Sequence, residues 1–161
     1  MISDIDKQHL RRCIELAKYA LTLGDEPFGS VLVSDKGKVL FEDHNRVANG
    51  DHTRHPEFEI ARWAAANLSL EERRNSTVYT SGEHCPMCAA AHGWVGLGRI
   101  VYASSSKQLT DWLDEFCVSK SQVKPLPIDE ILNDVLTEGP VEEFENEIRN
   151  LHAIRHTNSI K

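Results

Sequence analysis

The stretch HPEFEIARW, residues 55–63, begins a predicted amphipathic helix in which Pro56 fits the first helical position. The start of this helix also carries His55, Glu57 and Glu59. Packing against a hydrophobic core does not require a histidine and two carboxylates at that place. The residue types therefore predict a chemical role for this turn.

The cysteine pattern supplies partners for His55. Cys85 and Cys88 form a C-x-x-C pair at the start of a predicted alanine-rich helix, where free N–H groups and the helix dipole favour thiolates. One imidazole and two thiolates leave the fourth tetrahedral position of a zinc ion to water, as in catalytic sites. We predict one Zn²⁺ per chain, bound by His55, Cys85 and Cys88.

Each motif also has a simpler explanation when taken alone. A C-x-x-C can be a redox pair or a loop feature, and a His-x-Glu can be two polar side chains on a helix surface. Their occurrence together, each at the start of a helix, is rarer and favours the metal site. Glu57 is then the candidate catalytic residue, because a carboxylate beside a zinc-activated water can take its proton.

Composition and length predict a single domain over residues 1–161, with 40% hydrophobic residues to form one core. The 25 acidic and 18 basic residues give a formal charge of −7, which argues against nucleic acid as the main partner. No leader pattern or run of about 18 apolar residues occurs, so we expect a cytoplasmic protein without a membrane partner.

Four cysteines are too few for a disulfide framework, and we expect Cys13 and Cys117 to be ordinary buried thiols.

Hydrophobic periodicity and turn residues predict a mixed sheet covered by helices. A helix over 4–23 begins at a Ser3-x-x-Asp6 cap, and Gly37 provides the turn of a hairpin. A polar loop over 45–54 leads to the helix at His55. The remaining predicted elements are hairpin strands at 29–34 and 38–43, a strand at 76–81, a helix within 85–98, a strand at 99–104 and a helix from about 141.

The motifs His55-Pro56-Glu57 and Cys85-Pro86-Met87-Cys88 resemble the H-x-E and C-x-x-C signature of the cytidine deaminase-like superfamily. The resemblance runs from about Phe28 to Tyr102, and is closest to bacterial guanine deaminases and tRNA adenosine deaminases. It also includes Pro27-Phe28-Gly29, Asn45-Arg46, YTSGEHCPMC and VYA. It implies a three-layer α/β/α sandwich around a five-stranded mixed sheet, usually assembled as a homodimer.

The resemblance and the residues agree on hydrolytic deamination, in which Glu57 carries a proton from water to the departing amine. The chain departs from the family pattern in three places: Pro56 replaces an alanine, His84 replaces a proline, and the 45–55 loop is one residue shorter. We expect His84 to be a surface imidazole or one next to the site, with the pocket mouth as the alternative. It is not expected to be a fourth ligand.

By analogy with the family, Asn45 would hydrogen-bond the heterocycle or sugar, and Phe28 and Trp94 would form apolar walls for a planar ring. Trp94 fits almost as well as a core aromatic. The segment LTDWLDEF, residues 109–116, offers further candidates for a lid or pocket wall. These are Asp111, Trp112, Asp114 and Phe116, although Asp114 also fits an acidic surface helix.

The expected substrate is a free nucleobase, with guanine or a similar aminopurine first and cytosine or a nucleoside next. The alternatives are a tRNA adenosine-to-inosine deaminase and a catalytically silent zinc-binding homologue. A tRNA deaminase needs a basic docking surface, whereas the terminal helix is acidic. The silent homologue would have no use for Glu57. The acidic residues of the terminal helix are Glu142, Glu143, Glu145 and Glu147.

Overall fold

The computed structural model describes residues 1–158, in which five strands form one mixed sheet in the order β2-β1-β3-β4-β5. The last three residues of the predicted domain lie outside the described residues. The β1 strand pairs antiparallel with β2 and β3, whereas β3, β4 and β5 run parallel. The strands are β1 (Gly29–Val33), β2 (Val39–His44), β3 (Thr77–Gly82), β4 (Arg99–Ser104) and β5 (Thr137–Glu138).

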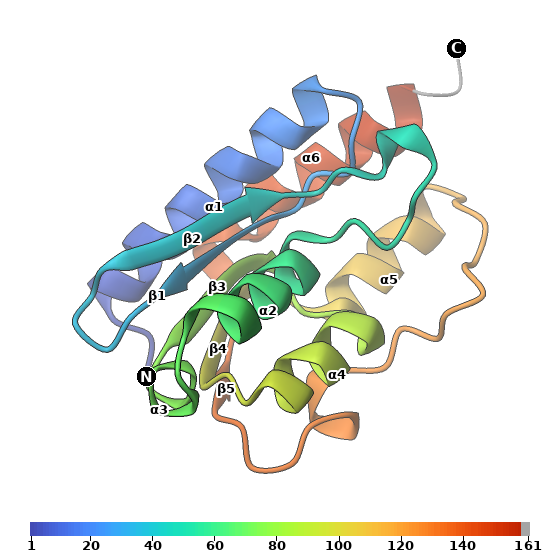
Figure 1. Ribbon diagram of the computed structural model, residues 1–161. Helices are drawn as coiled ribbons and strands as arrows, with labels where there is room; N and C mark the ends of the chain where they lie inside the picture. Colours follow the sequence, from blue (N-terminus) through green and yellow to red (C-terminus); the bar gives the residue numbers. More distant parts are fainter. Residues whose placement is uncertain (159–161) are drawn as a thin grey trace.

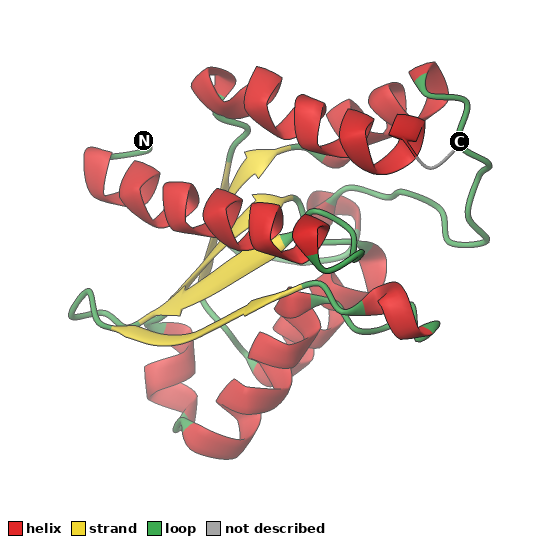
Figure 2. Cartoon of the chain, turned by 90° about the horizontal axis from the view of Figure 1, so that it is seen from above, coloured by secondary structure: helices red, strands yellow, loops and turns green. Residues whose placement is uncertain are grey.

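Helices cover both faces of the sheet, as Figures 1 and 2 show. One layer contains α1 (Asp4–Thr22), α5 (Ser106–Glu115) and α6 (Glu145–Thr157), and the other contains α2 (Pro56–Asn67), α3 (Leu70–Arg74) and α4 (Pro86–Val95). Within residues 1–158, short 3₁₀ turns lie at Val47–Asn49, Ile128–Glu130 and Glu142–Phe144. The predicted three-layer α/β/α sandwich with a five-stranded mixed sheet is confirmed.

The first helix and hairpin form for the reasons that the sequence indicates. Ser3 and Asp6 make a reciprocal capping box at the start of α1. Gly37 has a φ of +77° in the β1–β2 turn, a conformation that glycine adopts without strain. Gly29 allows α1 to pack closely on β1, because a Cβ there would lie 2.4 Å from the carbonyl oxygen of Cys13.

Two elements, α3 and β5, have no prediction at their positions, and α5 was anticipated only as the acidic surface helix that Asp114 fits. The five residues of α3 and the two of β5 are too few for a periodic pattern. The β5 strand forms because Thr137 pairs with Ile100 of β4. Cys117 was expected to be buried, and this prediction is wrong: it follows α5 with a φ of +57°, and its thiol is exposed.

A buried carboxylate ties α1 to the sheet. Asp6 accepts hydrogen bonds from Arg99 Nη1 (2.8 Å), Arg99 Nη2 (3.1 Å) and the hydroxyl of Tyr79 (2.7 Å). Burial opposes the charge, but these bonds and those from Ser3 hold the pKa of Asp6 well below its usual range. The ionised carboxylate therefore stabilises the folded chain at neutral pH.

Replacing Asp6 with Asn is expected to cost about 2–3 kcal/mol of unfolding free energy at pH 7, because Arg99 loses a buried partner. Since the folded-state pKa is depressed, the advantage of the wild type should shrink as the pH falls below about 4. Urea unfolding at several pH values measures both effects. Asp4→Asn is the matched control, since Asp4 is exposed in the same turn. Equal losses in the two variants would contradict this account.

Candidate active site

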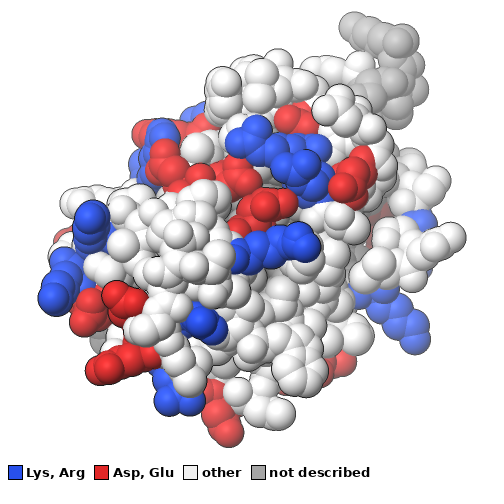
Figure 3. All heavy atoms as spheres, in the orientation of Figure 1, with Lys and Arg blue, Asp and Glu red and all other residues white. Residues whose placement is uncertain are grey.

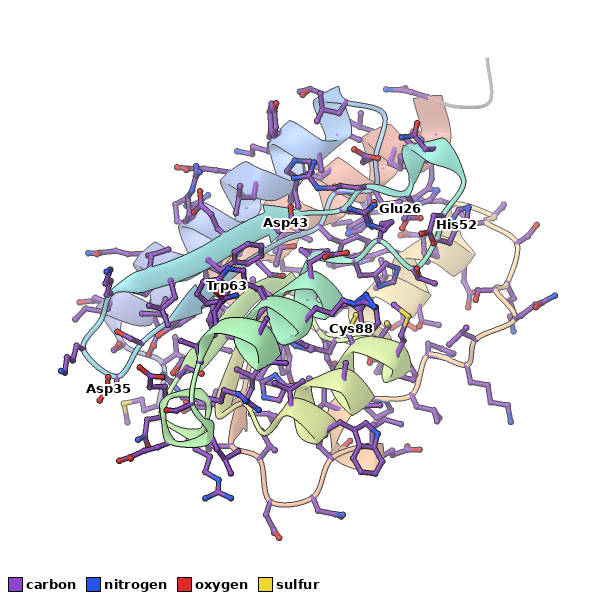
Figure 4. The ribbon with its side chains drawn as sticks, viewed as in Figure 1. Glu26, Asp35, Asp43, His52, Trp63 and Cys88 are labelled. Atoms are coloured by element: carbon purple, nitrogen blue, oxygen red, sulfur yellow. The ribbon has the colours of Figure 1, made fainter. Side chains whose placement is uncertain are left out.

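Two helix starts bring the predicted metal ligands together. His55 is the N-cap of α2 and Cys85 is the N-cap of α4, and each is followed by a proline at the first helical position. A residue before proline is held extended, and both N-caps are extended. Figure 4 shows Cys88, from the first turn of α4, in the space between α2 and α4.

The three predicted ligands form a compact group. Nδ1 of His55 lies 3.5 Å from Sγ of Cys85 and 3.6 Å from Sγ of Cys88, and all three ligand atoms lie within 4.8 Å of one another. Tetrahedral zinc with ordinary bond lengths places a nitrogen and a sulfur ligand about 3.6 Å apart. The donor set and its spacing therefore fit one zinc ion.

The electrostatics of this group favour a bound cation. The hydrogen bond with Cys88 lowers the pKa of Cys85 to about 4, so this thiol is ionised at neutral pH. Burial disfavours a charged His55, but the hydrogen bond with Cys85 raises the pKa of His55 to about 9. The hydrogen bond with Cys85, together with burial, raises the pKa of Cys88. A divalent cation would displace the protons held by His55 and Cys88.

Glu57 lies buried in the first turn of α2, and two strands fix its side chain. Its Oε1 accepts hydrogen bonds from Oγ of Ser30 in β1 (2.8 Å) and Oγ1 of Thr80 in β3 (2.9 Å). Neither bond uses Oε2. Burial raises the pKa of Glu57, although nearby His55 opposes this shift. The carboxyl group is therefore held in place and can carry a proton.

A cavity of about 590 Å³ opens beside these residues, within the range of small-molecule sites. His55, Glu57 and Cys85 line it, together with residues of the 118–125 segment. Most of the lining comes from elements that follow the metal motifs in the sequence. The walls include Glu26, Phe28, Leu109, Leu113, Asp114, His152 and His156.

The three predicted substrate residues occupy different places. Phe28 lines the cavity. Asn45 is buried outside the cavity lining, where its Oδ1 accepts hydrogen bonds from the backbone N–H groups of Glu26 (3.2 Å) and Val47 (3.1 Å). Its Nδ2 is buried and has no hydrogen-bond partner among residues 1–158. Asn45 thus holds the chain that leads into β1, with one donor unused.

Trp94 does not reach the cavity, and neither prediction for it describes its position. Its side chain is 91% exposed, beside a separate shallow hollow that Leu132 also lines. The inward face of α4 is formed instead by Cys88, Ala89 and His92, which are buried. The alanine-rich sequence of α4 does not indicate which face of this helix is buried.

His84 lies neither on the surface nor at the pocket mouth. It is 1% exposed, and its ring packs edge-on against His92 at 5.4 Å between centroids. Burial lowers the pKa of His84, so the ring is neutral. Neither ring nitrogen has a partner within the described part of the chain. The surface position that was expected is therefore wrong, whereas the other part of that expectation, an imidazole next to the site, agrees with a buried ring that directly precedes Cys85.

The candidates from residues 109–116 separate into cavity, surface and core residues. Asp114 lines the cavity, whereas Asp111 pairs with Lys107 on the surface. Trp112 is buried in the core. Phe116 packs against that core and lies beneath the guanidinium of Arg149.

Several groups around the cavity were not found from the sequence. Ser30 and Thr80 anchor Glu57, and their signal is a hydroxyl within an otherwise buried strand. His152 and His156 share one face of α6 because they are four residues apart. Glu83 accepts hydrogen bonds from the backbone N–H groups of Ser106 (2.7 Å) and Ile128 (2.8 Å), and so holds α5 near the cavity.

A three-layer fold with a buried carboxyl group beside a His-Cys-Cys group is the arrangement expected of a zinc-binding deaminase. Residues 3–104 match the family model described as the cytidine and deoxycytidylate deaminase zinc-binding region, so the chain belongs to this deaminase family. Its zinc-binding region and the His55, Cys85 and Cys88 group establish one zinc ion as the cofactor.

Curated relatives carry different substrate names. A probable cytosine deaminase from Schizosaccharomyces pombe is 34% identical over 67% of this chain and 65% of its own length. A tRNA-specific adenosine deaminase from Haemophilus influenzae is 36% identical over 64% of this chain and 60% of its own length. The chain thus spans less than two thirds of these two relatives. A guanine deaminase from Bacillus subtilis is 32% identical over 72% of this chain and 76% of its own length.

A solved guanine deaminase from Nitrosomonas europaea has the same fold. The two structures superpose with a TM-score of 0.68 over 98% of this chain and 86% of that chain, at 15% sequence identity. This similarity confirms the architecture. Separately, no helix within residues 1–158 is long and apolar enough to cross a membrane.

Proposed function

We propose that this protein hydrolytically deaminates a free nucleobase or a related heterocycle and releases ammonia. The observation that carries the proposal is Glu57, a buried carboxyl group in the cavity beside His55 and Cys85. A zinc site with only a structural role would not need this group. Deaminases use such a carboxyl group as general acid and base.

The residues of the chain divide the reaction between them. Zinc, when bound by His55, Cys85 and Cys88, would lower the pKa of water so that it can lose a proton near neutral pH. Glu57 accepts a proton from water and delivers it to the amine that leaves the ring carbon. Ser30 and Thr80 keep its carboxyl group oriented during both transfers.

The lining of the cavity supports an aminopurine as the first choice of substrate. Phe28 offers an aromatic surface for a planar ring. Glu26 and Asp114 offer carboxylates that can accept hydrogen bonds from ring N–H groups and a second amine. Guanine and similar aminopurines carry such donors. Cytosine and nucleosides are the next candidates, in line with the relative named as a probable cytosine deaminase.

Ammonia release from a panel of heterocycles tests the proposal. The zinc-loaded protein is assayed with guanine, other aminopurines, cytosine, nucleosides and pterin-like rings. We expect the highest kcat/KM with a free aminopurine. Binding without ammonia release from any compound would instead identify a silent homologue. Equal rates before and after zinc removal would contradict a zinc-dependent reaction.

The proposal also predicts that tRNA binding is undetectable at physiological salt. The relative from Haemophilus influenzae favours tRNA as the second candidate substrate, but this chain has a formal charge of −7. Figure 3 shows Lys and Arg interspersed with Asp and Glu on the face it displays. Nucleic-acid binding needs clustered cations. Tight, salt-sensitive tRNA binding with inosine formation would make the tRNA deaminase the correct assignment.

The homodimer that the family resemblance implies is part of this proposal. Sedimentation equilibrium of the zinc-loaded protein would give twice the mass of one chain if it is correct. The mass of a single chain at all concentrations tested would contradict it.

A further inference from the structure

The C-terminal helix places a histidine in the cavity that the reaction described above does not use. Figure 1 shows α6 running alongside α1 toward the side of the molecule where α5 lies. His152, on the inner face of α6, is 2% exposed and lines the cavity. Its ring centroid lies 5.1 Å from that of Phe28 and 6.1 Å from that of Trp112.

The packing of this histidine leaves its polar atoms without a partner in the protein. Among residues 1–158, neither ring nitrogen of His152 has a hydrogen-bond partner. His152 lines the cavity, whereas the buried ring of His84 does not. A phenylalanine would fill this position without the cost of burying an unpaired imidazole. The arrangement therefore indicates a hydrogen-bonding partner that enters through the cavity.

The charge state of His152 defines which partner it fits. Burial lowers its pKa to about 3, so the ring is neutral at physiological pH. A neutral imidazole has one N–H donor and one nitrogen acceptor. It therefore suits an uncharged ring nitrogen, an exocyclic amine or a carbonyl group better than a phosphate.

We propose that His152 is a specificity-determining residue that hydrogen-bonds the edge of a planar heterocycle packed on Phe28. Because Phe28 and His152 are in contact, a ring that lies on Phe28 also lies next to the imidazole. Glu57 then acts on the reacting carbon, while His152 holds another part of the ring. This inference rests on the proposed function and assigns recognition to a helix outside the family model's matched region.

Two variants separate the hydrogen bond from the packing. His152→Phe keeps an aromatic ring beside Phe28 and Trp112 but removes both polar nitrogens. His152→Gln keeps a donor and an acceptor but removes the aromatic ring. His9→Phe is the matched control, because His9 packs on Tyr79 away from the cavity. Zinc content and thermal unfolding are measured for each protein, and kcat and KM are determined for the whole panel of heterocycles.

We expect His152→Phe to lower kcat/KM for the preferred heterocycle about 10–100-fold, mainly through a higher KM. Zinc content should be unchanged, and heterocycles without the recognised group should be affected least. His152→Gln should recover part of the loss, and His9→Phe should behave as the wild type. If His152→Phe does not fold, the substrate ranking of His152→Gln tests the role of His152 instead. A changed ranking would support that role, and an unchanged ranking would contradict it.

Two results would contradict the inference in different ways. Wild-type kcat/KM values and an unchanged substrate ranking in the folded His152 variants would overturn the role of His152 but leave the proposed function intact. No ammonia release from any heterocycle by the zinc-loaded wild type would overturn the proposed function, and the role of His152 with it.

Discussion

Replacing Glu57 with Gln is expected to reduce turnover by at least ~10²-fold, and toward or beyond ~10⁴-fold, because one carboxyl group serves both proton transfers. Glutamine retains the size of the side chain and can still accept hydrogen bonds from Ser30 and Thr80. It cannot accept a proton from water. Fold, zinc content and substrate binding should therefore change far less than the rate.

The measurement is ammonia release by the wild type and Glu57→Gln at matched zinc content. Glu59→Gln is the control, because Glu59 lies on the same helix and pairs with Arg54 instead of lining the cavity. We expect its turnover to be close to that of the wild type. If Glu57→Gln kept more than about a tenth of wild-type turnover, Glu57 would not be the proton shuttle.

Removing a zinc ligand should be the second large effect. The purified wild type is expected to hold about one zinc ion per chain, and Cys85→Ala or Cys88→Ala should lose it. Three protein ligands leave little redundancy, so loss of one thiolate should also abolish ammonia release. Metal analysis after dialysis, together with the activity assay, measures both effects.

Cys117→Ala is the matched control for these variants, because Cys117 is an exposed thiol outside the cavity. It should retain both zinc and activity. Full zinc occupancy in a Cys85→Ala, Cys88→Ala double variant would contradict the ligand assignment. It would also leave the low pKa of Cys85 without a role in metal binding.

Sequence patterns were informative where one local rule determines the structure. The Ser3 and Asp6 cap, the Gly37 turn and the prolines after His55 and Cys85 each act within a few residues, and the structure has them as expected. The fold class followed from strand and helix order and from the family motifs. The three predicted metal ligands also came together, because all of them lie at the starts of α2 and α4.

The walls of the cavity could not be predicted in the same way, because they depend on contacts between distant segments. Glu57 is anchored by Ser30 and Thr80 from two strands far from it in the sequence. His152 reaches the cavity only because α6 packs against α1 and α5. Trp94 is the converse case: it follows the metal motif closely in the sequence, but it is exposed and does not line the cavity.

The most direct test of the central claim is the source of the oxygen in the product. The preferred heterocycle is converted in water enriched in ¹⁸O by the zinc-loaded protein and by protein treated with a chelator. We predict that each ammonia released is matched by one heavy oxygen at the carbon that lost the amine, and that chelation stops both. A product without the label, or ammonia release that survives complete zinc removal, would contradict zinc-dependent hydrolytic deamination by this chain.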